Sequence, residues 1–223
     1  MSNNIIFEFN EFNKININLI FNDCKQHISD LKKSNIGSFF YRSMKIDIGT
    51  YKKMNHIKNR FPLSTPLKYH NMINKISKIY FNYEIRNGVF IYNKPITNIF
   101  HKKLYGDTYI MFPIGKYDIY WNPEIFDLFT KFNFNEQDFE LDLEIEYEIN
   151  NLKNKISFDD FKKHKKNENE KIIKSALKKL IKEYKKNNIS EYFKYYVEAS
   201  VDVNYYYLIN MKYKKILEKQ IWG

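Results

Sequence analysis

The segment from residue 197 to residue 209 places the tightest limit on what this 223-residue chain can fold into. Apolar or aromatic side chains occupy its odd positions, and Glu198, Ser200, Asp202 and Asn204 occupy even ones. This alternation predicts a half-buried β-strand. A strand must pair with other strands to satisfy its backbone groups.

Four earlier segments supply candidate partners. Residues 88–92, 108–114 and 116–121 are short, rich in β-branched and aromatic residues, and bounded by turn residues. We expect 108–114 and 116–121 to form a hairpin across Gly115. The aromatic run 38–44 is a further strand, and it carries Arg42.

Helical spacing appears between these strands. Apolar residues at helical intervals predict a helix over 17–33. Thr65 and Pro66 fit the N-cap and the first position of a helix that runs from about 66 to 80. By the same logic, the sequence Asn-Pro-Glu at 122–124 predicts another helix start, and 172–184 forms an amphipathic helix.

The later part of the chain contains an acidic segment followed by a lysine-rich segment. Residues 136–148 hold seven acids and no base, while 153–186 hold thirteen Lys against five acids. Apolar residues alternate within 136–148, yet Glu is a poor strand former, so its structure stays open. The sequence predicts one α+β domain over 1–223, with a core at about 36–130 and 188–212 and a charged helical insertion at about 131–187.

Composition narrows the chemistry. The net charge is +11, but only Arg42, Arg60 and Arg86 among 37 basic residues are arginine. In a chain that otherwise uses Lys, each Arg is a candidate for a site that needs a planar, bidentate donor. No run of 18 apolar residues occurs, so we expect no membrane association.

The single cysteine and the scattered histidines argue against a metal site and against a reactive thiol. Cys24 is the single cysteine, which suits a reducing cytoplasm, and no Cys/His cluster has metal spacing, so we expect no metal. Cys24 and His27 lie one helical turn apart and could form a thiol pair. The favoured interpretation is a core thiol beside a surface histidine.

The order of several local patterns points to a family. They are Tyr41-Arg42-Ser43-Met44, Asn59-Arg60-Phe61-Pro62 leading to Thr65-Pro66, Gly88-Val89-Phe90, Tyr105-Gly106 leading to Gly115-Lys116-Tyr117, Trp121-Asn122-Pro123 leading to Asp127-Leu128, and Glu198-Ala199 leading to Tyr206-Tyr207-Leu208. In this order the chain resembles the NAD-dependent ADP-ribosyltransferases, above all those encoded by phages and viruses. The resemblance covers about 38–209.

The resemblance implies a fold and a reaction. The fold would be a split, mixed or antiparallel β-sheet with flanking helices. NAD would be the substrate: Arg42 would hold its phosphate or ribose, and Glu198 would stabilise the charge that develops as nicotinamide leaves. Tyr92, Phe100 or Tyr105 would stack on nicotinamide. ADP-ribose would pass to a host macromolecule, protein or nucleic acid, in the host cytoplasm, with virion association as an alternative.

The resemblance is incomplete. The family's Ser-Thr-Ser strand corresponds to 88–92, which begins without hydroxyl residues, and Ser43 follows Arg42 where Gly is usual. Tyr196 stands where arginine-modifying members carry Glu or Gln, which disfavours arginine as the acceptor. These departures leave open a loss of activity.

Other interpretations compete with this one. The chain could be an inert relative that serves as a binding or virion-associated module, or a nonspecific nucleic-acid binder that uses the Lys-rich helix at about 171–186. Glu144-Ile145-Glu146 and Glu146-Tyr147-Glu148 also spell the family's Glu-x-Glu motif. Arg42 and Glu198 could instead be a buried ion pair or strand-edge charges. If they share one NAD site, their strands should lie side by side, with both side chains on one face.

Overall fold

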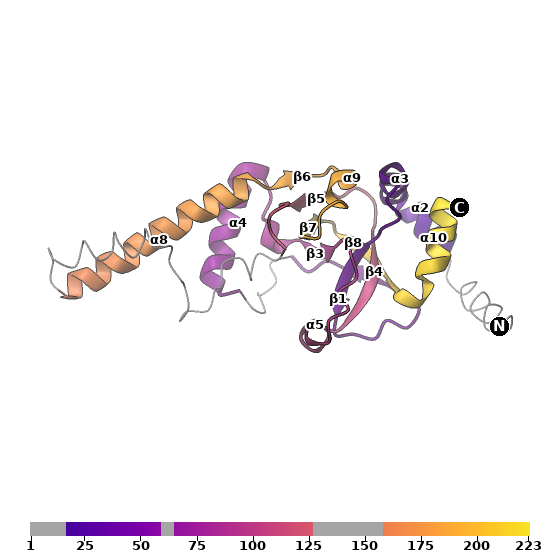
Figure 1. The fold of residues 1–223 in the computed structure, drawn as a ribbon, viewed down its shortest axis with the longest axis horizontal. Coiled ribbons are helices and arrows are strands. Elements are labelled where there is room, and N and C mark those ends of the chain that lie inside the picture. The colour runs from indigo at the N-terminus through magenta and orange to yellow at the C-terminus, as the bar shows by residue number, and fades with distance from the viewer. Residues whose placement is uncertain (1–16, 59–64, 127–157) are drawn as a thin grey trace. The chain divides into compact units, whose positions relative to one another are not determined.

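The computed structural model describes residues 17–58, 65–126 and 158–223 (Figure 1). The chain divides into two compact units, one made of 1–60, 87–126 and 185–223 and the other of 61–86 and 127–184. We call them unit 1 and unit 2. Most of the expected charged insertion falls in unit 2, together with residues 61–86.

Unit 1 is built on one open sheet of eight strands in the order β2-β8-β4-β1-β3-β7-β5-β6. All neighbouring strands pair antiparallel, which confirms the α+β class. The strands are β1 (Phe40–Met44), β2 (Tyr51–Asn55), β3 (Val89–Tyr92), β4 (Asp107–Pro113), β5 (Asp118–Trp121), β6 (Lys185–Lys186), β7 (Glu198–Asp202) and β8 (Tyr205–Asn210).

Helices of unit 1 cover this sheet. They are α2 (Ile17–Asp23), α3 (Lys25–Ser34), α5 (Ile99–Tyr105), α9 (Ile189–Tyr192) and α10 (Lys214–Trp222), with a 3-10 turn η2 (Met211–Tyr213) before α10. Figure 1 shows α10 beside α3, with which it packs. The buried core combines aliphatic side chains with large aromatic ones, among them Phe39, Phe40, Phe112, Trp121 and Tyr192.

The sheet is weakest in its middle. β1 and β3 are joined through a single pair, Tyr41 with Tyr92, whereas β1 pairs with β4 over five positions. Beyond that pair the two strands part. The eight strands therefore form two groups of four that meet at Tyr41 and Tyr92.

The expected hairpin across Gly115 is wrong. β4 pairs with β1 and β8, and β5 pairs with β7 and β6. The turn between them is bound elsewhere, because Gly115 N donates to Asp23 O at 2.9 Å and Ile114 N donates to Tyr205 O at 2.9 Å. Alternation identifies a strand but does not encode its partner.

The single strand expected at 197–209 is two strands, β7 and β8. Between them, Val203 and Asn204 form a turn, and His56 N donates to Asn204 O at 2.8 Å. β7 pairs with β3 and β5, while β8 pairs with β4 and β2. The chain crosses between the two groups of strands at this turn.

Two smaller expectations also differ. Residues 122–126 form a turn in which Asn122 Oδ1 accepts from Glu124 N at 2.9 Å, so the helix expected to start at 122–124 is not found within these residues. The helix expected at 17–33 is found as α2 and α3, with Cys24 between them. The acidic segment 136–148 lies outside the described residues.

Cys24 and His27 are both completely buried, so the core thiol is confirmed and the surface histidine is wrong. Burial raises the pKa of the Cys24 thiol to about 12, and its Sγ lies 3.8 Å from Phe112 O. His27 packs against the rings of Phe40 and Phe112. A thiol held neutral in this way is a poor nucleophile.

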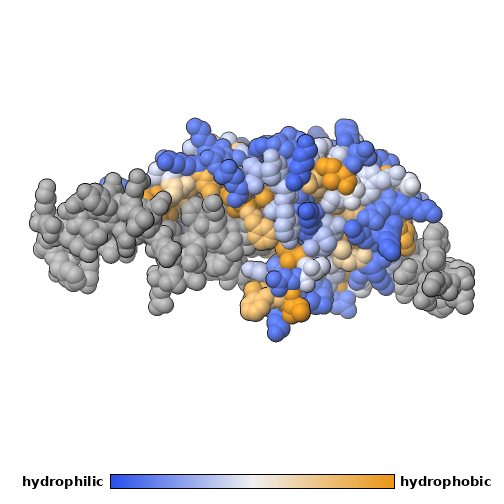
Figure 2. Space-filling model, in the orientation of Figure 1, coloured by the Kyte–Doolittle hydropathy of each residue, from blue (hydrophilic) through white to orange (hydrophobic). Residues whose placement is uncertain are grey.

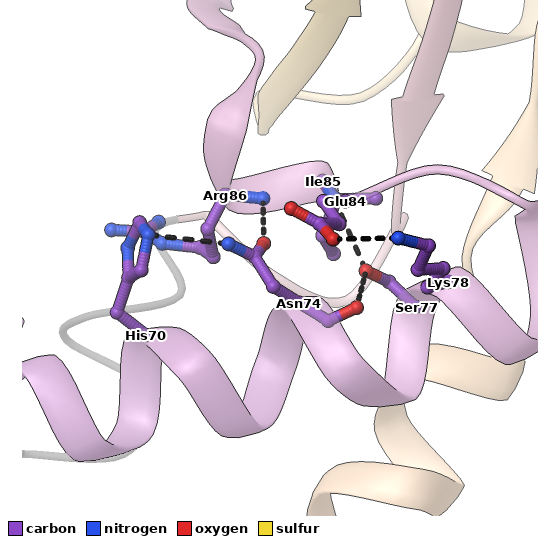
Figure 3. Close-up of polar contacts among 7 residues, drawn as sticks. All are labelled: His70, Asn74, Ser77, Lys78, Glu84, Ile85 and Arg86. Carbon is purple, nitrogen blue, oxygen red and sulfur yellow. Dashed lines mark hydrogen bonds and ion pairs between the residues drawn. The ribbon is translucent and has the colours of Figure 1, made fainter. Parts of the chain in front are cut away.

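Unit 2 contains α4 (Leu67–Phe81), which packs against α8 (Phe158–Lys182). Side chains of α4 accept hydrogen bonds from the backbone of the 3-10 turn that follows it, η1 (Ile85–Asn87), at the first two residues of that turn (Figure 3). Asn74 Oδ1 accepts from Arg86 N at 2.9 Å, and Ser77 Oγ accepts from Ile85 N at 3.1 Å.

The N-cap of α4 is Pro66 rather than Thr65, so the expected start is one residue early. Thr65 Oγ1 instead accepts from the buried guanidinium of Arg86 at 2.9 Å. That tertiary contact occupies the oxygen that would otherwise cap the helix.

Candidate functional site around Glu198

The candidate site lies on β3 and β7, in the middle of the sheet. Tyr92 on β3 and Glu198 on β7 are directly opposed, and Tyr92 OH donates to Glu198 Oε2 at 3.2 Å. Both side chains are half-buried. Opposed residues of an antiparallel pair share a face of the sheet, so this carboxylate and this phenol form one local unit.

Aromatic rings surround the pair. Glu198 N donates to Phe126 O at 2.9 Å, which fixes the first residue of β7 against the turn that follows β5. The Phe126 ring lies 6.0 Å from the Tyr92 ring and 4.9 Å from the Tyr196 ring. Tyr92, whose hydroxyl binds the carboxylate, is therefore one of a group of three rings, Tyr92, Phe126 and Tyr196.

Helix α5, over which Figure 2 shows hydrophobic residues at the surface, adds two more rings near Tyr92. The His101 ring lies 6.1 Å from Tyr92 and 4.7 Å from Tyr105. The helix is fixed at its start by Asn98, whose Oδ1 accepts from Phe100 N at 2.8 Å. Of the three aromatic candidates, Tyr92 is hydrogen-bonded to Glu198. Tyr105 is in ring contact with His101, whose ring in turn contacts Tyr92. Phe100 projects into solvent, 74% exposed.

Arg42 lies on β1 and contacts the same central strand. Its Nη1 donates to Phe90 O on β3 at 2.9 Å. If the ladder continued past the pair of Tyr41 with Tyr92, Ser43 would oppose Phe90. Arg42 thus reaches into the gap where β1 and β3 part, and it supplies the donor that the interrupted ladder lacks.

The relation of Arg42 to Glu198 differs from the expectation. Their strands are not side by side, because β3 lies between them. Tyr41, Tyr92 and Glu198 share a face through their pairing, whereas Arg42, the next residue after Tyr41, starts from the other face of β1. Among the described residues Arg42 forms no ion pair, and its buried Nε has no hydrogen-bond partner. The alternative of a buried ion pair with Glu198 therefore gains no support.

The residues that sequence reasoning missed are His101 and Phe126. His101 and Tyr105 are four apart in a helix, so their common face could have been found once a helix was assigned there. Nothing in the sequence connects Phe126 to Glu198, since they lie 72 positions apart and meet through a backbone bond. The alternative acidic motifs at 144–148 lie outside the described residues.

The part of the chain that the structure describes contains neither a candidate metal site nor a membrane-spanning helix. It holds no group of three or more His, Cys, Asp or Glu residues that could bind a metal ion. None of its helices combines the length and apolar character needed to cross a membrane.

Comparison with known proteins adds no relative. No protein-family model matches the chain, and neither a curated protein nor a solved structure matches it significantly.

Proposed function

We propose that this protein binds NAD in unit 1, cleaves the bond between nicotinamide and ribose, and transfers ADP-ribose to a macromolecule of a host cell, as a phage or virus ADP-ribosyltransferase would. The observation that carries the proposal is the Glu198 carboxylate, held by the Tyr92 hydroxyl among aromatic rings. A carboxylate in a partly water-excluded aromatic setting is suited to stabilise a cationic sugar.

The chemistry asked of Glu198 is electrostatic. When the glycosidic C–N bond breaks, its electron pair leaves with nicotinamide, and positive charge develops on the ribose carbon and ring oxygen. A carboxylate near that ring stabilises the charge and can accept a hydrogen bond from a ribose hydroxyl. The acceptor then forms a new bond to the ribose carbon and loses a proton. Such a group contributes about 3 to 4 kcal/mol to transition-state stabilisation.

The other expected residues take supporting roles in this proposal. Tyr92 orients the carboxylate by donating a hydrogen bond to Oε2. Tyr92 and Tyr105 are better placed than the exposed Phe100 to stack on nicotinamide. Arg42 starts from the opposite face of the sheet to Glu198, so in this proposal its guanidinium would have to reach NAD through the gap between β1 and β3, with donors other than the Nη1 bond to Phe90 O.

Measurement of NAD cleavage by purified protein tests the proposal. Glu198→Gln keeps the shape and removes the charge, so the rate of nicotinamide release should fall about 100-fold or more. Glu124→Gln is a suitable control, because Glu124 is exposed in the turn near Phe126. Loss of cleavage in Glu146→Gln or Glu148→Gln, with Glu198→Gln unaffected, would move the site to the acidic segment.

One observation favours the inert relative as a second candidate. Arg42 already donates to a backbone carbonyl of the sheet, which is a structural task that needs no NAD. An inert binding module would show no nicotinamide release from the unmodified protein, at any NAD concentration. That result separates the two candidates.

A further inference from the structure

A surface next to Glu198 exposes two aromatic side chains. Tyr196 and Phe126 are 41% and 44% exposed. Monomeric proteins seldom leave grouped apolar rings in water unless they bind something. Both residues belong to unit 1, and their rings are in contact at 4.9 Å.

The segment that presents Tyr196 is firmly held. Asn93 is 1% exposed, and its Nδ2 donates to the carbonyl of Tyr192 at 3.1 Å and to that of Tyr195. Tyr195 N in turn donates to Tyr192 O at 3.1 Å. Tyr196 therefore projects from a fixed turn just before β7, which limits the conformational entropy that a ligand must remove on binding.

A lysine lies over one of these two rings. The Lys94 ammonium is 5.6 Å from the centre of the Tyr196 ring, and Lys194, two residues before Tyr196, is exposed. The neighbouring Tyr195 ring instead lies 5.6 Å from the ring of Trp121, which opposes Ala199 and is therefore on the other face of the sheet from Glu198. Positive charge thus occurs together with the exposed rings of Tyr196 and Phe126.

We propose that this surface, formed by Phe126, Tyr196, Lys94 and Lys194, binds single-stranded nucleic acid. Bases would stack on Tyr196 and Phe126, and phosphates would contact Lys94 and Lys194. Resting on the proposed function, we further assign the strand as the acceptor, because the same rings adjoin Glu198. ADP-ribose would then be attached to a nucleophilic group of a nucleotide, which loses its proton as nicotinamide departs.

The chemistry of the surface favours a single strand over other polyanions. A duplex hides the faces of its bases, whereas a single strand can place them on aromatic rings. An acidic peptide would gain from the lysines but not from the rings. The exposed lysines of α8 offer charge alone.

Fluorescence anisotropy with fluorescein-labelled 12-nucleotide oligo(dT) and oligo(U) tests this site at 50 mM and 200 mM salt. Tyr196→Ala and Phe126→Ala should each weaken binding about tenfold, within the range expected for loss of one stacked base. Tyr196→Trp should retain binding, because the ring face is kept. Lys94→Ala should reduce the salt dependence.

Tyr205→Ala is the matched control. Tyr205 is 48% exposed on β8, and the Lys53 ammonium lies 5.7 Å from its ring, so it repeats the pairing of lysine and tyrosine away from Glu198. Tyr205→Ala should bind the oligonucleotides normally, and so should Lys178→Ala in α8. An equal loss in Tyr205→Ala, or no binding by the unmodified protein at 50 mM salt, would overturn the proposal. Displacement by polyglutamate as effective as by unlabelled oligonucleotide would also overturn it.

The outcome is independent of NAD cleavage. Oligonucleotide binding needs no NAD, and Glu198→Gln should bind oligonucleotides as the unmodified protein does. Binding that depends on Tyr196 without nicotinamide release supports the surface and contradicts the enzyme. Nicotinamide release without oligonucleotide binding supports the enzyme and excludes this surface as its acceptor site.

Discussion

Arg42 shows how one residue can serve the sheet and a ligand. Its Nη1 bond to Phe90 O fills a position that a continued ladder would have given to Ser43. A carbonyl left without a donor at this point would cost about 1 to 3 kcal/mol. The sequence argument for a planar fork at Arg42 is therefore compatible with a structural cause as well as with NAD.

Arg42→Lys separates the two roles. Lysine keeps the charge but removes the fork, so we expect the dissociation constant for NAD to rise at least about tenfold, the loss of a hydrogen bond to a charged group. We also expect a small decrease in the free energy of unfolding, because the bond to Phe90 O is weakened. Isothermal titration and urea unfolding on the same variant measure both. A less stable protein with unchanged NAD affinity would leave Arg42 with the sheet role alone.

His27 is a buried neutral histidine. Burial lowers its pKa from 6.5 to about 3. Tyr117 OH donates to Asp30 Oδ2 at 2.9 Å and lies 3.1 Å from His27 Nδ1, so we infer that Nδ1 carries the proton and donates to the phenol. The folded protein therefore disfavours a second proton on this ring.

This pKa predicts a dependence of stability on pH. Because the folded-state pKa is lowered, the stabilisation is present above about pH 6.5 and is lost as the pH falls toward 3, where only the unfolded state has gained a proton. Between pH 7.5 and 5 the free energy of unfolding should drop by about 2 kcal/mol relative to His27→Phe. Chemical unfolding at several pH values measures the difference. A difference that does not change with pH would contradict the assignment.

At the scale of elements, the junction of α5 with β1 depends on one glycine. Gly106 ends α5 at φ +90, and a Cβ there would lie 2.1 Å from Met44 O. No side chain fits against a backbone carbonyl at that distance. The chain therefore needs glycine to bring α5, with His101 and Tyr105, against β1 and close to Tyr92.

Gly106→Ala should lower the free energy of unfolding by about 2 to 4 kcal/mol, from backbone strain and overpacking together. Gly115→Ala is the control, since Gly115 also has a positive φ, +72, but has open space around its Cβ position. It should cost only about 1 kcal/mol. Thermal unfolding of both variants compares them. Equal losses would show that the contact with Met44 O is unimportant.

At the scale of the molecule, the candidate residues all belong to unit 1. Arg42, Tyr92, Tyr105 and Glu198 fall in its segments, and α4 and α8 fall in unit 2. The site is thus assembled from three stretches of chain that unit 2 interrupts.

NAD should therefore protect unit 1 selectively. At 100 times its dissociation constant, a ligand that binds only the folded state adds about 2.7 kcal/mol. Hydrogen exchange should slow in β3 and β7 on addition of NAD, and α4 should exchange as before. Mass spectrometry of peptic peptides measures this. Protection confined to α4 and α8 would place NAD in unit 2 and contradict the site.

The sequence by itself determined several of the strands and helices and which residues could carry charge to a site. Aromatic and β-branched runs bounded by turn residues identified β1, β3, β4 and β5, and helical spacing identified α4 and the end of α8. Those signals are local, since each depends on residues a few positions apart. Arg42 on a strand and Glu198 at the start of one follow from the same local reasoning.

Only the tertiary structure decided which strands meet. Two strands in sequence, β4 and β5, pair with other strands instead of each other, and β3 separates the strands of Arg42 and Glu198. The burial of His27, the contact of Phe126 with Tyr196, and the fit of Gly106 against Met44 depend on those pairings. Pairing is chosen by packing among residues far apart in the chain, and the periodicity of one segment carries no record of its partner.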